Sequence, residues 1–138
     1  MEDFTEKKKY LMQYRDAVDR IADMHRKLER VQAARLGTSC GMNGMPHASS
    51  PGDRMGEGLE RVEDARQQLQ QAYQQAKRAR KRVLDAIYTV DDMERSILMQ
   101  RYITGFTMEG IANNLHKSLR RVQQIHRKAL MEINVERT

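Results

Sequence analysis

The sequence predicts an all-α protein, in which a long antiparallel coiled-coil helical hairpin precedes a small three-helix domain containing a helix-turn-helix. Three observations lead to this fold. Two long segments carry apolar residues at alternating spacings of three and four, a stretch rich in Gly and Pro separates them, and two short amphipathic segments lie near the C-terminal end. A repeat of 3.5 residues is typical of helices that pack along a seam. We therefore expect the hairpin over residues 1–90 and the small domain over residues 91–138.

The first arm of the hairpin is expected over residues of about 5–36. Its apolar positions follow a heptad pattern of large side chains. They are Tyr10, Tyr14, Ala17, Ile21, Met24, Leu28 and Val31. This pattern defines a first seam about three heptads long.

The second arm is expected over residues of about 57–89 and has a seam dominated by small residues. Its positions are Val62, Ala65, Leu69, Ala72, Ala76, Ala79, Val83, Ala86 and Val90. Large side chains facing alanines allow two helices to approach closely, and the sustained 3.5-residue period implies left-handed supercoiling. A parallel coiled-coil dimer is the rival arrangement. Two helices bury little core, so we expect the hairpin to pack against the C-terminal domain or against a second copy.

The segment between the arms, at about residues 37–57, is predicted to be a flexible loop. It contains most of the glycines and both prolines of the chain, and these residues favour turns and loops. Cys40 and His47 also lie there, but two ligands cannot complete a tetrahedral zinc site. We expect no metal site, and the single cysteine fits a reducing compartment.

The small domain begins with a predicted capping box, Asp91 to Glu94, which starts a helix. Ile97, Leu98 and Tyr102 are expected to pack on the helix-turn-helix. Its first helix is capped by Thr107 and buries Ile111, Ala112 and Leu115. The second is capped by Ser118. Its buried stripe consists of Val122, Ile125, Ala129 and Leu130.

The outward face of this last helix is basic and rich in amides. From Gly110 through Met131 the sequence contains no acidic residue, so its arginines and lysines are unopposed. DNA phosphates attract such charge, while Arg and Gln can form paired hydrogen bonds with base edges. The net charge of +6 agrees with a nucleic-acid partner.

Residues 93–133 resemble region 4 of the sigma-70 factors, the promoter-reading domain. The matching residues are Arg101 with Tyr102, Gly105, Thr107, Ile111 with Ala112, Leu115, Ser118, Arg121 with Val122, Gln124 with Ile125, and Lys128 through Leu130. The resemblance is greatest to the phage-encoded region 4-like regulators. It implies a transcription regulator that binds double-stranded DNA sequence-specifically through helix 118–131 and that contacts RNA polymerase.

Roles for single residues follow from the helix face and from this resemblance. Bases would be read by Leu119, Arg120, Gln123 and Gln124. Phosphates would be bound by Arg101, Thr107, Lys117, Arg121, Arg127 and Lys128. The sequence departs from the family pattern at His116, where Gly is common in the turn, and at Leu119, Arg120 and Gln123. We expect His126 to face solvent or DNA.

Two other functions remain open on sequence grounds. One is a small-terminase-type DNA-packaging recognition subunit, and the other is a helical protein-interaction module. The basic run over residues 77–82 is read as a solvated helix face in preference to a phosphate contact. The heptad helices also make a homo-oligomer an option.

Enzymatic and membrane functions find no support in the sequence. There is no phosphate-binding Gly-rich loop, no nucleophile-base arrangement and no carboxylate pair in an apolar context. We expect a protein that is not an enzyme and has no cofactor. No apolar run reaches membrane-spanning length, so we expect it in the cytoplasm of a bacterial host cell.

Overall fold

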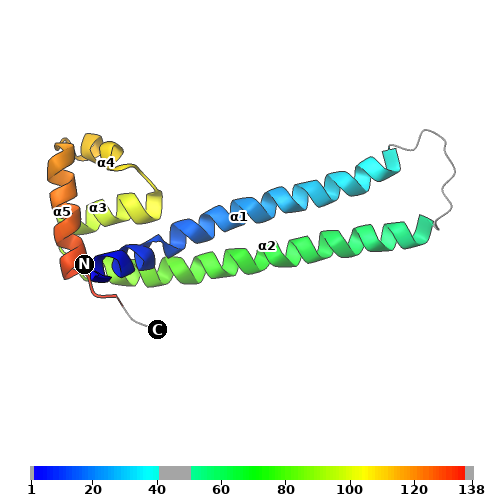
Figure 1. The fold of residues 1–138 in the computed structure, drawn as a ribbon, viewed down its shortest axis with the longest axis horizontal. Helices are drawn as coiled ribbons and strands as arrows, with labels where there is room; N and C mark the ends of the chain where they lie inside the picture. Colours follow the sequence, from blue (N-terminus) through cyan, green and yellow to red (C-terminus); the bar gives the residue numbers. More distant parts are fainter. Residues whose placement is uncertain (1, 41–50, 136–138) are drawn as a thin grey trace. The chain divides into compact units, whose positions relative to one another are not determined.

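The structure is a computed structural model that describes residues 2–40 and 51–135, and these residues form helices joined by short turns, without a strand. The elements are α1 (Glu2–Cys40), α2 (Pro51–Ile87), α3 (Asp92–Leu98), the π-helix η1 (Met99–Thr104), α4 (Met108–Leu115) and α5 (Leu119–Glu132). Figure 1 shows their order along the chain. The predicted all-α class is confirmed, and the two long helices fit a hairpin.

The long helices reach further into the Gly- and Pro-rich segment than the sequence pattern predicts. Helix α1 ends at Cys40 and α2 begins at Pro51, whereas a loop was expected over residues 37–57. A proline is tolerated at a helix start because the first backbone N–H has no helical acceptor in any case. His47 and the side chain of Cys40, considered above as metal ligands, lie outside the described residues.

Backbone contacts divide the chain into two compact units. The first unit contains residues 1–17 and 76–138, and the second contains residues 18–75. Each unit thus includes parts of both α1 and α2. The domain boundary expected near residue 90 stays a prediction, since this division follows contacts and not the sequence pattern.

Within the second unit, α1 and α2 run antiparallel. His25 Nε2 lies 2.7 Å from the Tyr73 hydroxyl, and Lys27 Nζ donates to Gln68 Oε1 at 2.7 Å. Lys27 follows His25 in α1, whereas its partner Gln68 precedes Tyr73 in α2. The two helices therefore run in opposite directions. The two antiparallel helices can be followed in Figure 1.

The heptad seams differ in how deeply they are buried. Every residue of the second seam is buried except Leu69, which is half-buried, while the residues of the first seam are all half-buried. The second seam does not pack on α1 alone, since Val83, Ala86 and Val90 lie in one core with residues of the C-terminal helices. The larger side chains of the first seam keep part of their surface in water.

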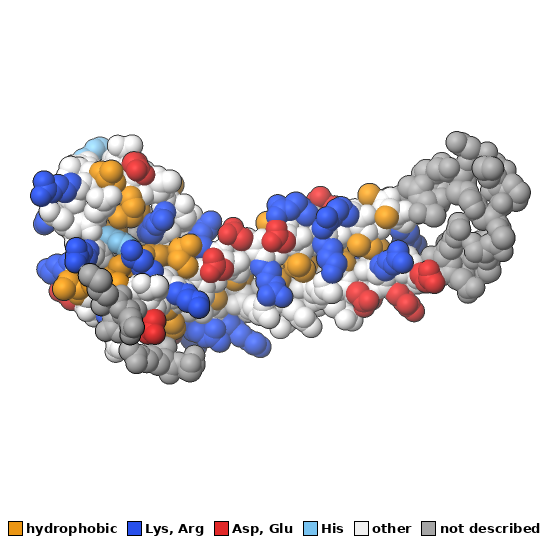
Figure 2. Space-filling model, viewed as in Figure 1, with side chains coloured by type: hydrophobic (Ala, Val, Ile, Leu, Met, Phe, Trp, Pro, Cys, Tyr) orange, Lys and Arg blue, Asp and Glu red, His pale blue; other side chains and the backbone are white. Residues whose placement is uncertain are grey.

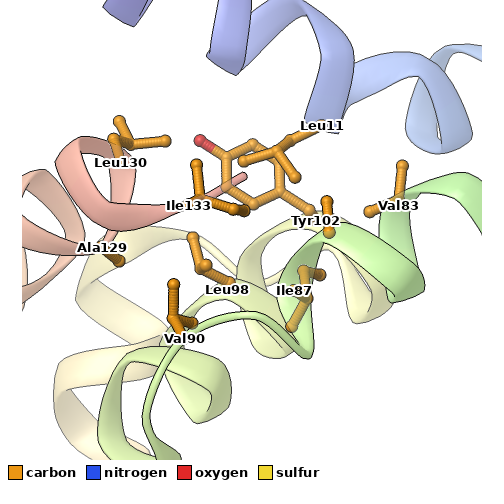
Figure 3. Packing of buried hydrophobic residues seen from close by; sticks show 10 residues of the cluster. Leu11, Val83, Ile87, Val90, Leu98, Tyr102, Ala129, Leu130 and Ile133 are labelled. Atoms are coloured by element: carbon orange, nitrogen blue, oxygen red, sulfur yellow. The ribbon is translucent and has the colours of Figure 1, made fainter. Parts of the chain in front are cut away.

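The main core of the first unit joins the ends of the two long helices to the C-terminal helices. Its buried members are Leu11, Val83, Ala86, Ile87, Val90, Leu98, Tyr102, Ala129, Leu130 and Ile133. Figure 3 shows Leu11 of α1 above the Tyr102 ring, with side chains of α2, α3 and α5 around them. The expected packing of the hairpin on the C-terminal helices is therefore present within this unit.

A second, smaller core holds the helix-turn-helix together. It consists of Ile97, Ile111, Ala112, Val122 and Ile125, with Met108 and Leu115 packed against it. Ile97 lies in this core as predicted. Leu98 of α3 and Tyr102 of η1 belong to the main core, where they pack with Ala129 and Leu130 of α5 and also with residues of α1 and α2. No helix of the described residues is long and apolar enough to cross a membrane.

Candidate nucleic-acid interface

Both helices of the helix-turn-helix begin at the predicted hydroxyl caps. The Thr107 hydroxyl oxygen accepts a hydrogen bond from the Gly110 N–H at 3.1 Å, and the Ser118 hydroxyl oxygen accepts one from the Arg121 N–H at 3.1 Å. A cap of this kind satisfies one of the backbone donors that the first helical turn leaves unpaired. These two local interactions determine where α4 and α5 begin.

The turn between α4 and α5 passes through a left-handed residue. His116 has φ 54° and ψ 42°, and among the described non-glycine residues it alone has a positive φ. The Lys117 N–H donates to the Ala112 carbonyl at 3.0 Å and closes the turn. A side chain in this conformation costs roughly 1 kcal/mol relative to Gly. The departure from the family pattern therefore leaves the turn intact but strained.

Helix α5 separates its side chains into a buried stripe and a charged outer face. Val122, Ile125, Ala129 and Leu130 are buried. The exposed residues are Arg120, Arg121, Gln123, Gln124, Arg127 and Lys128, and Leu119 is half-buried. Lys and Arg side chains are visible along α5 at the left edge of Figure 2. The outer face is thus open to a polyanionic partner.

The polar side chains among the candidate base-reading residues have no partner in the part of the chain that the structure describes. Arg120, Gln123 and Gln124 form no hydrogen bond or ion pair with any other residue that the structure describes. They lie near the start of α5, on the face opposite its buried stripe. Guanidinium and amide groups held in this way can exchange water for the hydrogen-bonding edges of bases.

The candidate phosphate-binding residues divide into free and partnered groups. Exposed Arg121 and half-buried Lys117 have no side-chain partner among the described residues. Thr107 is exposed, and its hydroxyl caps α4. Arg101 Nη1 donates to the Phe106 carbonyl at 3.2 Å and braces the turn before α4.

The two basic residues in the second half of α5 contact other helices. The Arg127 guanidinium lies 5.9 Å from the Phe4 ring centroid, and Lys128 Nζ lies 3.8 Å from Glu94 Oε1. Both side chains remain largely exposed at their own positions. Their charges therefore interact with groups of the protein itself, whereas Arg120 and Arg121 have no such partner among the described residues.

The expectation that His126 faces solvent or DNA is wrong. Its Nε2 lies 2.8 Å from the Tyr102 hydroxyl, and the two rings stack with centroids 5.7 Å apart. Burial, followed by the nearby Lys8 and Arg101 charges, lowers the pKa of His126 to about 4. Burial likewise raises the pKa of Tyr102 to about 12. The two side chains therefore form a hydrogen bond between uncharged groups. His126 is half-buried because η1 covers the edge of α5 on which it lies.

The predicted capping box at residues 91–94 forms only in part. Asp91 Oδ1 accepts from the Glu94 N–H at 3.0 Å, as expected of a helix cap. The Glu94 carboxylate does not return the interaction, since it is buried beside α5 and neither oxygen has a hydrogen-bond donor. Burial, together with the neighbouring Glu132 and Asp91 carboxylates, raises the pKa of Glu94 to about 6.

The N-terminal part of α1 contributes contacts that the sequence pattern did not indicate. Lys7 Nζ donates to the Leu130 carbonyl at 2.9 Å, where the last turn of α5 leaves acceptors unpaired. A cation at this end also interacts favourably with the helix dipole. Since the partners are far apart in the sequence, no periodicity in either segment could have revealed the contact.

The basic run over residues 77–82 follows the heptad pattern of α2. Ala79 is buried and the charged residues around it are exposed. Arg82 Nη1 donates to Gln13 Oε1 at 3.3 Å. The geometry agrees with a solvated helix face, which was the preferred interpretation.

The C-terminal part of the chain is similar to a known protein family. Residues 86–134 match the family model of sigma-70, region 4. The matched segment begins in the last turn of α2 and includes α3, η1, α4 and α5. Neither the curated proteins nor the solved structures yielded a match.

Proposed function

We propose that the protein is a sequence-specific transcription regulator that reads the major groove of double-stranded DNA with helix 118–131. The match of residues 86–134 to the family model of sigma-70, region 4, supports a DNA-binding helix-turn-helix. One observation carries the proposal. The outer face of α5, just after the turn in the sequence, holds arginine and glutamine side chains that have no partner among the described residues. A family whose fold binds DNA gives this exposed face a function.

In this proposal the start of α5 reads the bases. Arg120 would donate two hydrogen bonds to a guanine, and Gln123 or Gln124 would bind an adenine edge. Leu119, half-buried at the first position of α5, would contact a thymine methyl group. These four residues are free to differ between regulators because the small core of the domain does not use them.

The phosphate contacts would hold the helix in the groove. Lys117 and Arg121 are the strongest candidates, since both lie beside the turn without an internal partner. Arg127 and Lys128 would add weaker contacts, because Phe4 and Glu94 already engage them. Arg101 and Thr107 would contact the backbone while they stabilise the turn before α4.

The first experiment selects bound sequences from random duplex DNA with the full chain. We expect an enriched site, and we expect Arg120→Ala and Gln124→Ala each to relax the preference at one base position, at a cost of about 1–3 kcal/mol in binding. Enrichment of no sequence by the wild type, or of the same site with equal affinity by both variants, would contradict the base-reading assignment.

Salt titration separates phosphate binding from base reading. Replacing Arg121 by Ala should weaken binding to all duplexes alike and reduce the salt slope by about one. Arg61→Ala removes an exposed arginine of the second unit and serves as the matched control, which should leave the slope unchanged. Equal slopes for both variants would remove Arg121 from the interface.

The proposal extends to the cellular setting. Regulators with a region 4 domain can act by contacting RNA polymerase, and the resemblance of the sequence favours a phage-encoded regulator that works in the bacterial cytoplasm. The half-buried first seam supports association of two copies through the long helices. Transcription reconstituted with polymerase tests the polymerase contact. The mass of the protein in solution tests the association of two copies.

A further inference from the structure

Three carboxylates converge between the start of α3 and the last turn of α5. One oxygen from each of Asp91, Glu94 and Glu132 lies within 4.8 Å of the others. We propose that these three residues bind a hard divalent cation such as Mg²⁺ or Mn²⁺. The histidines and the cysteine of the sequence predict no metal site, whereas this cluster depends on residues about 40 positions apart that the fold brings together.

The buried carboxylate of Glu94 is the independent observation that supports a ligand. Its side chain is 2% exposed, and neither oxygen has a hydrogen-bond donor among the described residues. A buried carboxylate without donors carries a large desolvation penalty. A cation bound at its oxygens would offset that penalty.

The nearest positive charge does not fill this role. Lys128 Nζ lies 3.8 Å from Glu94 Oε1, which is beyond hydrogen-bond distance, and its side chain is largely exposed. One ammonium group also faces three carboxylates. The cluster therefore keeps an excess of negative charge in a chain that is otherwise strongly basic.

The donor set and its access suit a small hard cation. Mg²⁺ is usually bound in proteins by one or two carboxylates and retains several water molecules. Glu94 offers oxygens from the buried side, while Asp91 and Glu132 are exposed and leave room for water. Asp91 uses Oδ1 to cap α3, so its other oxygen is the one left for a ligand.

Crowding of the carboxylates agrees with the proposal. The pKa of Glu94 is raised to about 6, with burial as the main cause and the Glu132 and Asp91 carboxylates as further causes. A proton shared between Glu94 and Glu132 is the alternative way to relieve the repulsion between their carboxylates.

Mn²⁺ binding to the full chain tests the site directly. Electron paramagnetic resonance of a Mn²⁺ titration should show saturable binding at neutral pH, and Mg²⁺ should compete for the same site. Glu132→Gln, at an exposed position, should weaken Mn²⁺ binding about tenfold or more. Glu109→Gln removes an exposed carboxylate of α4 and should change nothing.

Replacing Lys128 gives a prediction of opposite sign. Lys128→Met removes the charge that repels a cation, so the variant should bind Mn²⁺ more tightly than the wild type. Absence of saturable Mn²⁺ binding, or equal binding by the Glu132→Gln and Glu109→Gln variants, would overturn the proposal. If a proton alone relieves the repulsion between the carboxylates, the full chain will show no saturable Mn²⁺ binding.

Discussion

At the scale of single residues, the pair formed by His126 and Tyr102 shows how burial changes a side chain's role. An imidazole on a recognition helix could have faced DNA, but here it stacks on a tyrosine ring and binds its hydroxyl group. Its pKa near 4 keeps it uncharged over the physiological range. His126 thus contributes to the stability of the first unit and adds no charge to the DNA-facing surface.

This pair predicts a loss of stability in acid. The His126 pKa is about 4 in the folded protein and about 6.5 in the unfolded chain, so between these pH values only the unfolded chain binds the proton. The stabilising contribution is therefore complete above about pH 6.5 and is lost as the pH falls towards 4. In His126→Gln, the deficit in unfolding free energy relative to wild type should shrink by on the order of 2 kcal/mol over this range.

Denaturant unfolding of both proteins at a series of pH values measures this difference. Glu94 titrates in the opposite sense, because its raised pKa of about 6 makes the folded protein the stronger proton acceptor. Both proteins retain Glu94, so its contribution cancels in the comparison. A deficit that stays constant with pH would show that the pKa of His126 is the same in the folded and unfolded protein.

The elements around the turn show which features local sequence determines. The hydroxyls of Thr107 and Ser118 cap their helices through a partner three residues away, so the sequence alone predicts where α4 and α5 begin. The burial of Leu11 is different. It lies beside the first heptad seam and is buried because η1 and α5 cover it. That cover comes from distant parts of the chain.

The same distinction applies to the candidate site. The outward face of α5 follows from one helical period, so its free arginine and glutamine residues could be predicted. The engagement of Arg127 by Phe4, of Lys128 by Glu94 and of His126 by Tyr102 depends on tertiary contacts, which periodicity does not encode.

The strained turn between α4 and α5 gives a second prediction. His116→Gly should stabilise the protein by up to about 1 kcal/mol, because Gly relieves the left-handed strain but gains entropy in the unfolded chain. His116→Val should destabilise it, since a β-branched residue tolerates this conformation poorly. Thermal unfolding of the two variants, which differ from wild type at one exposed position, provides the measurement. If the glycine variant is the less stable of the two, backbone strain does not govern this position.

At the scale of the whole molecule, the first unit depends on side chains from both ends of the sequence. Leu11 is completely buried in the main core beside Tyr102 and Val83. Leu11→Ala should therefore destabilise the protein by roughly 2–5 kcal/mol. It should also reduce amide hydrogen-exchange protection in α5, although the two segments are more than a hundred residues apart.

Leu28→Ala is the matched control for this variant. Leu28 is a half-buried leucine of the same helix in the second unit, so its loss should cost less and leave protection in α5 unchanged. Equal effects of the two substitutions on α5 would mean that α1 does not support the DNA-binding helices.

The composition of the first unit also has a consequence for how the chain acquires its structure during synthesis. Residues up to Ala17 belong to a core that is complete only when Ile133 has been synthesised. In the sequence, residues 18–75 lie between these two parts as an insertion into the first unit. Neither the main core nor the smaller core includes a described residue from this insertion. The arms of the hairpin could therefore lengthen or shorten in evolution while the same DNA-reading unit is retained.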